Sequence, residues 1–150
     1  MTDLETLKTE VAKILEHEEG FRSHVYEDTL GFATIGIGRC IHGGVGVGLS
    51  CSEAVYLLKN DVFRCVTELE NAFSWFKNTD HERQKILVCL VFQLGLPKLK
   101  RFKLMLEAFE SQNYESAALE LLDSRFAREQ VPARAKRIAD AIRTCLLYTS

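Results

Sequence analysis

The sequence predicts an α+β fold in which helices dominate and the strands are confined to one region near the N-terminus. Apolar side chains recur at helical spacing over residues 3–17, whereas residues 24–42 mix β-branched and aromatic residues with glycines. From residue 50 onward the apolar pattern is helical again. Strands that are segregated from the helices along the chain are typical of α+β proteins with a small antiparallel sheet.

In the first half of the chain, glycines and a capping pattern mark the element boundaries. Gly20 should end the first helix, because glycine readily adopts the backbone conformation that stops a helix. A glycine-rich loop at 43–49 should follow the sheet. Ser50 and Glu53 have the spacing of a capping box, so they should begin a long helix over residues 51–71.

The second half is predicted to be helical throughout. Thr79 and Glu82 also have capping-box spacing, and they precede a segment that is apolar on every side, so we expect that helix to be buried. It should stop at Gly95, and Pro132 suits the first turn of the last helix. The remaining helices are expected near residues 99–111, 114–128 and 132–146.

A chain of 150 residues fits one domain built from two small lobes. We expect a small lobe at residues 15–50 and a helical lobe at residues 72–146, joined by the long helix. Residues 1–14 should pack on the helical lobe, and a cleft should lie between the lobes.

Charge is unevenly distributed although the net charge is only −2. Residues 1–96 carry 9 Lys+Arg against 14 Asp+Glu, and residues 97–150 carry 10 against 7. A basic C-terminal half could attract cell-wall glycan, nucleic acid or a membrane surface, and it could equally be a solvated face. Because no nucleic-acid-binding motif is present, we expect no nucleic-acid partner.

The five cysteines are odd in number and irregularly spaced. This indicates reduced, mostly buried thiols rather than a disulfide framework. Cys40, His42 and Cys51 are a conceivable metal set, but they lack the close cysteine pairs of structural zinc sites. We therefore expect no metal.

Two carboxylates and a hydroxyl surround one predicted hairpin. Glu19 ends a helix, where the helix dipole disfavours a negative charge, and Asp28 and Thr34 follow near the first turn. Each has an ordinary explanation: a solvated glutamate, a turn aspartate and a strand threonine. Together they match what glycoside cleavage requires, a carboxylic acid for the leaving oxygen and a carboxylate for water or the sugar.

These residues lie in blocks that resemble the phage-type lysozymes of glycoside hydrolase family 24. The spacing of Glu19, Asp28 and Thr34 matches the catalytic set of that family. The resemblance extends over residues 15–143. Its matching blocks are Glu19 to Arg22, Tyr26 to Gly31, Thr34 to Gly38, Phe92 to Gly95, Ser124 to Phe126 and Pro132 to Arg137.

The resemblance implies a role for each matching residue. Glu19 would be the general acid, Asp28 would hold or activate the attacking water, and Thr34 would help to position that water. Arg134 would reach the catalytic glutamate, unless it is an ordinary surface arginine. The sugar cleft would be lined by Phe92 and Gln93. We also expect Gly38 and Phe32 to bind the substrate, unless Phe32 only packs in the sheet.

The chain departs from the family pattern in three places. Arg39 stands where many members have a histidine, which implies an Arg39–Asp61 ion pair in place of a His–Asp pair, unless the two are unrelated surface charges. The segment at 43–49 is shorter than in T-even members and resembles compact lambdoid members. Met105 and Glu120 stand where T-even members have small polar cleft residues, which leaves the sugar and stem-peptide contacts open.

The resemblance therefore implies a lysozyme-like fold and a monomeric, bacteriolytic muramidase. It would cleave the β-1,4 bond between N-acetylmuramic acid and N-acetylglucosamine with inversion, and without a cofactor. The alternatives are a lytic transglycosylase, which Asp28 and Thr34 disfavour because both suit water, and a non-catalytic murein-binding module. Since residues 1–18 form no apolar targeting or membrane segment, we expect it in the host bacterial cytoplasm, reaching the wall after membrane permeabilisation.

Overall fold

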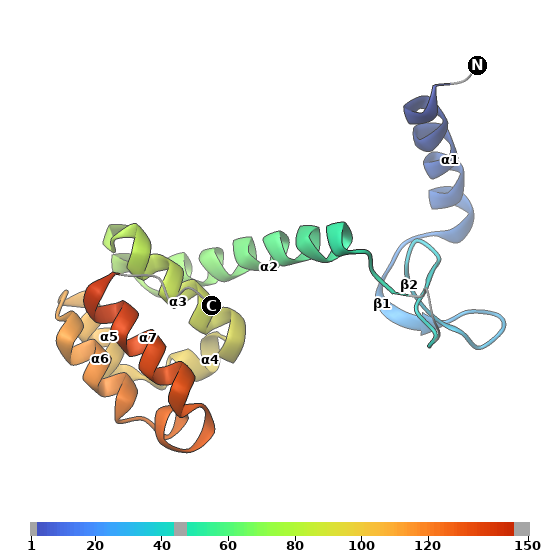
Figure 1. The fold of residues 1–150 in the computed structure, drawn as a ribbon. Helices are drawn as coiled ribbons and strands as arrows, with labels where there is room; N and C mark the ends of the chain where they lie inside the picture. Colours follow the sequence, from blue (N-terminus) through green and yellow to red (C-terminus); the bar gives the residue numbers. More distant parts are fainter. Residues whose placement is uncertain (1–2, 44–47, 146–150) are drawn as a thin grey trace. The chain divides into compact units, whose positions relative to one another are not determined.

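The computed structural model describes residues 3–43 and 48–145 and divides into two compact units, Met1–Ala54 and Val55–Ser150. The first unit holds the first helix, the sheet and the first residues of the second helix, and the second unit is helical (Figure 1). The predicted α+β class is confirmed. Residues 44–47 of the predicted loop lie outside the described residues, and the predicted lobe boundaries and cleft stay predictions.

Helix α1 (Leu4–Glu19) is delimited by an aspartate and a glycine. The Asp3 carboxylate accepts a hydrogen bond from the N–H of Thr6 at its start. At its end, Gly20 has φ of 69° and donates its N–H to the carbonyl of Glu16, which confirms the predicted stop. No described residue of α1 is buried, and the predicted packing of residues 1–14 on the helical lobe stays a prediction.

The sheet is a three-stranded antiparallel meander of β1 (Arg22–Glu27), β2 (Ala33–Gly36) and β3 (Arg39–Cys40). Tyr26 pairs with Thr34 and Ile35 pairs with Arg39. The β2–β3 turn depends on glycines, because Gly36 and Gly38 both have φ of 70°, a conformation that side chains disfavour. The predicted small sheet is confirmed.

Helix α2 (Cys51–Ala72) begins with the predicted capping box. The Ser50 hydroxyl accepts the N–H of Glu53, and the Glu53 carboxylate accepts the N–H of Ser50. The helix starts in the first unit and continues into the second. The elements that follow are η1 (Ser74–Asn78), α3 (His81–Leu94), α4 (Leu96–Leu99), α5 (Lys103–Glu110), α6 (Tyr114–Leu122), the π-helix η2 (Phe126–Gln130) and α7 (Pro132–Thr144).

Two predicted boundaries in the helical unit are wrong. Asp80, not Thr79, caps α3, since its carboxylate accepts the N–H of Arg83. The predicted helix at 114–128 is broken after Leu122. There the Ser124 hydroxyl accepts the N–H of Ala127 and so begins a separate turn.

The buried apolar core lies in the second unit, where α6 packs against both α5 and α7. Helix α3 contributes only one face, since Leu87 and Leu90 are buried while Cys89 and Phe92 are exposed. The prediction that α3 is buried on all sides is therefore wrong. The cysteines are free, but Cys65 is the buried one among the five, so the prediction of mostly buried thiols is also wrong.

Candidate active site

Glu19, the candidate acid, is exposed at the end of α1 and lies against the β2–β3 turn. A Cβ placed on Gly38 would come within 3.2 Å of the Cγ, Cδ and Oε2 atoms of Glu19. The structure thus brings together two of the predicted site residues that are far apart in the sequence.

Asp28 follows β1 directly and organises the β1–β2 turn. Its Oδ1 atom accepts the N–H of Leu30 at 2.9 Å and the N–H of Phe32 at 2.8 Å, and its own N–H donates to the carbonyl of Phe32. An aspartate before a turn commonly has this local role. Among the described residues, no hydrogen-bond donor to Oδ2 is found. The Oδ2 atom is therefore available to a water molecule or a sugar.

Thr34 lies in β2 with 3% of its surface exposed, the one buried residue in the described part of the first unit. Its hydroxyl donates to the carbonyl of Phe32 at 2.9 Å. Because the proton is engaged there, Oγ1 can offer only lone pairs to another partner. Asp28 and Thr34 are therefore linked through the backbone of Phe32, and both retain an acceptor oxygen.

Phe32, predicted to bind the substrate, keeps 41% of its surface exposed. Its ring lies 5.0 Å from the ring of His42, tilted by 35°. Exposed aromatic faces of this kind suit contact with sugar rings, which bury apolar C–H surface. The role of Phe32 in sugar binding stays a prediction.

Arg39 binds Glu53 near the start of α2, and the predicted Arg39–Asp61 ion pair, which would join the two units, stays a prediction. Its guanidinium binds both carboxylate oxygens of Glu53, at 2.6 and 3.1 Å, and donates to the carbonyl of Gly48. Within α2, a carboxylate oxygen of Asp61 lies 3.6 Å from the guanidinium of Arg64. The hydrogen bonds from Arg39 are the largest cause that lowers the pKa of Glu53 to about 2, and Glu53 in turn raises the pKa of Arg39.

The predicted site residues of the helical unit are exposed. Phe92 and Gln93 lie near the end of α3, and Arg134 lies in the first turn of α7. Their assignments to the sugar cleft and to the catalytic glutamate stay predictions. Within residues 3–43 and 48–145, no cluster of three His, Cys, Asp or Glu side chains could hold a metal ion.

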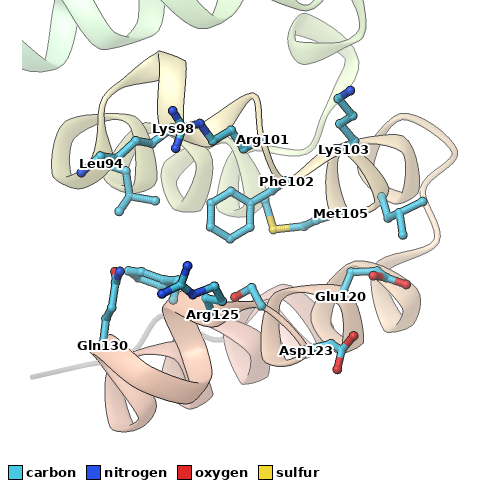
Figure 2. Close-up of a pocket in the computed structure, with 13 residues that line it drawn as sticks. Leu94, Lys98, Arg101, Phe102, Lys103, Met105, Glu120, Asp123, Arg125 and Gln130 are labelled. Atoms are coloured by element: carbon cyan, nitrogen blue, oxygen red, sulfur yellow. The ribbon is translucent and has the colours of Figure 1, made fainter.

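The helical unit also contains a pocket of about 570 Å³ between the α4–α5 segment and the α6–η2 segment (Figure 2). Phe102 and Met105 form an apolar surface between the two segments. Cations lie on both sides, and two carboxylates lie on the α6 side. The charged residues are Lys98, Arg101, Lys103, Arg125, Glu120 and Asp123.

The sequence had already drawn attention to Met105, Glu120, Leu94 and the block Ser124 to Phe126, which all line this pocket, but not to the cations Lys98, Arg101 and Lys103. The run of residues 98–103 holds four cations and one phenylalanine and could have drawn attention to them. A pocket that combines cations with the apolar surface of Phe102 and Met105 can bind a ligand that has both carboxylates and apolar groups.

Comparison with known proteins identifies the family. The family model described as phage lysozyme matches residues 16–139, which include Glu19, Asp28 and Thr34. The chain belongs to the phage lysozyme family. It is a glycoside hydrolase that acts on peptidoglycan, as members of that family do.

Relatives of this lysozyme occur in an amoeba and in a phage. It is 28% identical to "Probable T4-type lysozyme 2" of Dictyostelium discoideum over 87% of this chain and 92% of the relative. For "Probable T4-type lysozyme 1" of the same organism the identity is 26%, over 89% and 94%. It is also 28% identical to "Pre-baseplate central spike protein Gp5" of Enterobacteria phage T4, over 89% of this chain and 28% of that protein.

The predicted enzyme class and the predicted fold are thereby confirmed. In the described ranges, no helix is long and apolar enough to cross a membrane. The individual roles of Glu19, Asp28 and Thr34 stay predictions, although the structure places all three in one compact unit.

Proposed function

We propose that this lysozyme hydrolyses the β-1,4 bond between N-acetylmuramic acid and N-acetylglucosamine with inversion, and that this reaction lyses bacteria. The observation that carries the proposal is the grouping in one unit of an exposed glutamate against the β2–β3 turn, an aspartate at the β1–β2 turn and a buried strand threonine. We also propose that the protein is a monomer that reaches the wall from the bacterial cytoplasm after the membrane is permeabilised.

Glu19 is the general acid in this proposal. Glu19 is exposed, and no hydrogen bond to its carboxyl is found in the described part of the first unit, so the carboxyl is accessible to the leaving oxygen, to which a general acid would give a proton. An inverting enzyme also needs a water on the opposite face of the sugar, which requires carboxyl groups roughly 6.5–9.5 Å apart. The free oxygen of Asp28 and the Thr34 hydroxyl oxygen would accept hydrogen bonds from that water.

The helical unit would bind the rest of the polymer. Phe92 and Gln93 would contact sugars, and Arg134 would interact with Glu19. The pocket around Phe102 and Met105 would take the stem peptide, because its apolar floor, its cations and its two carboxylates complement a peptide that carries both carboxylates and an amino group.

The first test compares the wild type with Glu19→Gln on permeabilised cells and on purified murein. Glutamine keeps the shape but has no transferable proton, so the rate should fall by a factor of about 10²–10⁴. Glu18→Gln is the matched control, since Glu18 is the adjacent exposed glutamate and should tolerate the change.

The products separate the possible reactions. Hydrolysis gives a reducing end, and inversion gives the α-anomer as the first product. An anhydro end would identify a lytic transglycosylase. Full activity of Glu19→Gln would contradict the assignment of the acid, and binding without cleavage by the wild type would favour a murein-binding module.

The proposed role of the pocket is tested with Arg101→Gln. We expect KM to rise about twofold to fivefold for glycan strands that carry stem peptides, as for one exposed charge contact. KM should not change for strands stripped of their peptides. Lys100→Gln changes a neighbouring cation that does not line the pocket and should leave both values unchanged. An equal rise in KM for both substrates would instead assign the pocket to the sugars.

A further inference from the structure

We propose that Gly38 is a positioning residue for Glu19, because its missing side chain leaves the space that the carboxyl group occupies. This inference rests on the proposed role of Glu19 as the general acid. It differs from the substrate-binding role that the sequence predicts for Gly38, since here the glycine acts on the enzyme's own acid.

Gly38 and the side chain of Glu19 are in close contact. A Cβ on Gly38 would lie 3.2 Å from three atoms of the Glu19 side chain, including Oε2. Non-bonded carbon atoms prefer separations of about 3.5–4.0 Å, so any side chain at this position would displace the carboxyl group. Within the described part of the first unit, the contact with the turn limits the position of that carboxyl, and no hydrogen bond to it is found there.

The β2–β3 turn that contains Gly38 cannot move away easily. Next to Gly38, Arg39 pairs with Ile35 in the sheet, and its guanidinium is held by Glu53 and by the carbonyl of Gly48. Beyond the turn, the N–H of Ile41 donates to the carbonyl of Ala33 at 2.8 Å. A methyl group on Gly38 would therefore move the exposed Glu19 side chain by a few tenths of an ångström rather than the turn.

The chain offers a matched control in the same turn. Gly36 also has φ of 70°, but a Cβ there would meet nothing within 4 Å. Alanine in this left-handed conformation is strained at either position, so Gly36→Ala and Gly38→Ala should lower Tm equally, by about 2–8 °C. Only Gly38→Ala should displace Glu19.

The experiment measures kcat and KM on soluble murein glycan strands for both variants. Relative to Gly36→Ala, we expect Gly38→Ala to lose about tenfold in kcat, because small misplacements of a catalytic group are costly, and to keep its KM. In an inactive Glu19→Gln background, adding Gly38→Ala should leave the Kd for the same strands unchanged.

The outcomes separate this inference from the proposed function. If Glu19→Gln is inactive but the two alanine variants have equal kcat, only the positioning role is wrong. If Gly38→Ala raises KM and weakens binding in the Glu19→Gln background, Gly38 contacts sugar instead. If Glu19→Gln keeps full activity, the acid lies elsewhere and both proposals fail.

Discussion

The two units of this lysozyme are stabilised by different means. The helical unit contains the whole cluster of buried apolar side chains, whereas Thr34 is the one buried residue in the described part of the first unit. The first unit owes its shape to glycine turns, an aspartate turn, a capping box and one ion pair. The candidate acid, base and hydroxyl therefore lie in the unit with little buried apolar surface, where local hydrogen bonds and backbone conformation have to fix them.

Each unit also contains an arginine that binds a helix-capping carboxylate and backbone carbonyls. Arg83 binds the α3 cap Asp80, the carbonyls of Ile142 and Arg143, and the face of Tyr114, with 12% of its side chain exposed. Arg39 binds Glu53 and the carbonyl of Gly48 with 50% exposed. The contacts of Arg83 should contribute more to the free energy of folding than those of Arg39, because water competes less for a charge that is mostly buried.

The largest expected effect on stability is in the helical core. Leu121→Ala removes a fully buried side chain of α6 and should lower the free energy of unfolding by about 2–5 kcal/mol. Leu119→Ala on the same helix, where 53% of the residue is exposed, should change it by less than about 0.5 kcal/mol. Urea denaturation measures both. Equal effects would contradict the view that the core of the helical unit dominates stability.

The second prediction concerns Arg83, which connects the start of α3 with the end of α7. Arg83→Met removes the guanidinium from two helix-terminal carbonyls and from Asp80, which keeps only the backbone N–H of residue 83 from this pair, and it should cost about 2–3 kcal/mol. Arg64→Met, which breaks exposed ion pairs with Asp61 and Glu68 on α2, should change Tm little. A Tm loss for Arg64→Met as large as that for Arg83→Met would remove the distinction between buried and exposed arginines.

The activity of these variants sharpens the comparison between the units. If the chemistry depends on the first unit, the folded fraction of Leu121→Ala and of Arg83→Met should keep the wild-type kcat below their melting temperatures. A fall in kcat without unfolding would mean that the helical unit also determines the catalytic geometry.

Structural features that depend on residues close together in the sequence could be predicted. The capping box of Ser50 and Glu53, the stop at Gly20 and the small sheet all arise from contacts between near neighbours, and all are confirmed. The cap of α3 was mistaken because Thr79 and Asp80 both suit that position, and only the structure reveals that Asp80 also meets the guanidinium of Arg83.

Contacts between residues that lie farther apart in the sequence could not be predicted. Arg39 binds Glu53 because β3 and the start of α2 come together around Gly48, a geometry that no periodicity encodes. Likewise, glycines in a hairpin indicate a turn, but the pattern does not distinguish Gly36, which faces open space, from Gly38, which faces Glu19. The spacing that the chain shares with the family predicts which residues form the candidate site. Which of these residues contact one another is seen only in the structure.

The smallest expected effect is the pH dependence of the Arg39–Glu53 ion pair. Its carboxyl has a pKa of about 2 in the folded protein against 4.5 for the free side chain, chiefly because Arg39 donates hydrogen bonds to it. A lowered folded-state pKa means that the pair stabilises the fold above pH 4.5 and loses this contribution as the pH falls toward 2.

Two measurements test this pH dependence of the Arg39–Glu53 pair. The Tm difference between wild type and Glu53→Gln should be present at neutral pH and should shrink as the pH falls, whereas Glu10→Gln, an exposed glutamate on α1, should change Tm little at any pH. In an NMR titration the Glu53 pKa should rise toward the free value in Arg39→Met. An unchanged Glu53 pKa in Arg39→Met would mean that the capping hydrogen bond from Ser50 lowers it, and the first unit would then depend on its helix cap rather than on its arginine.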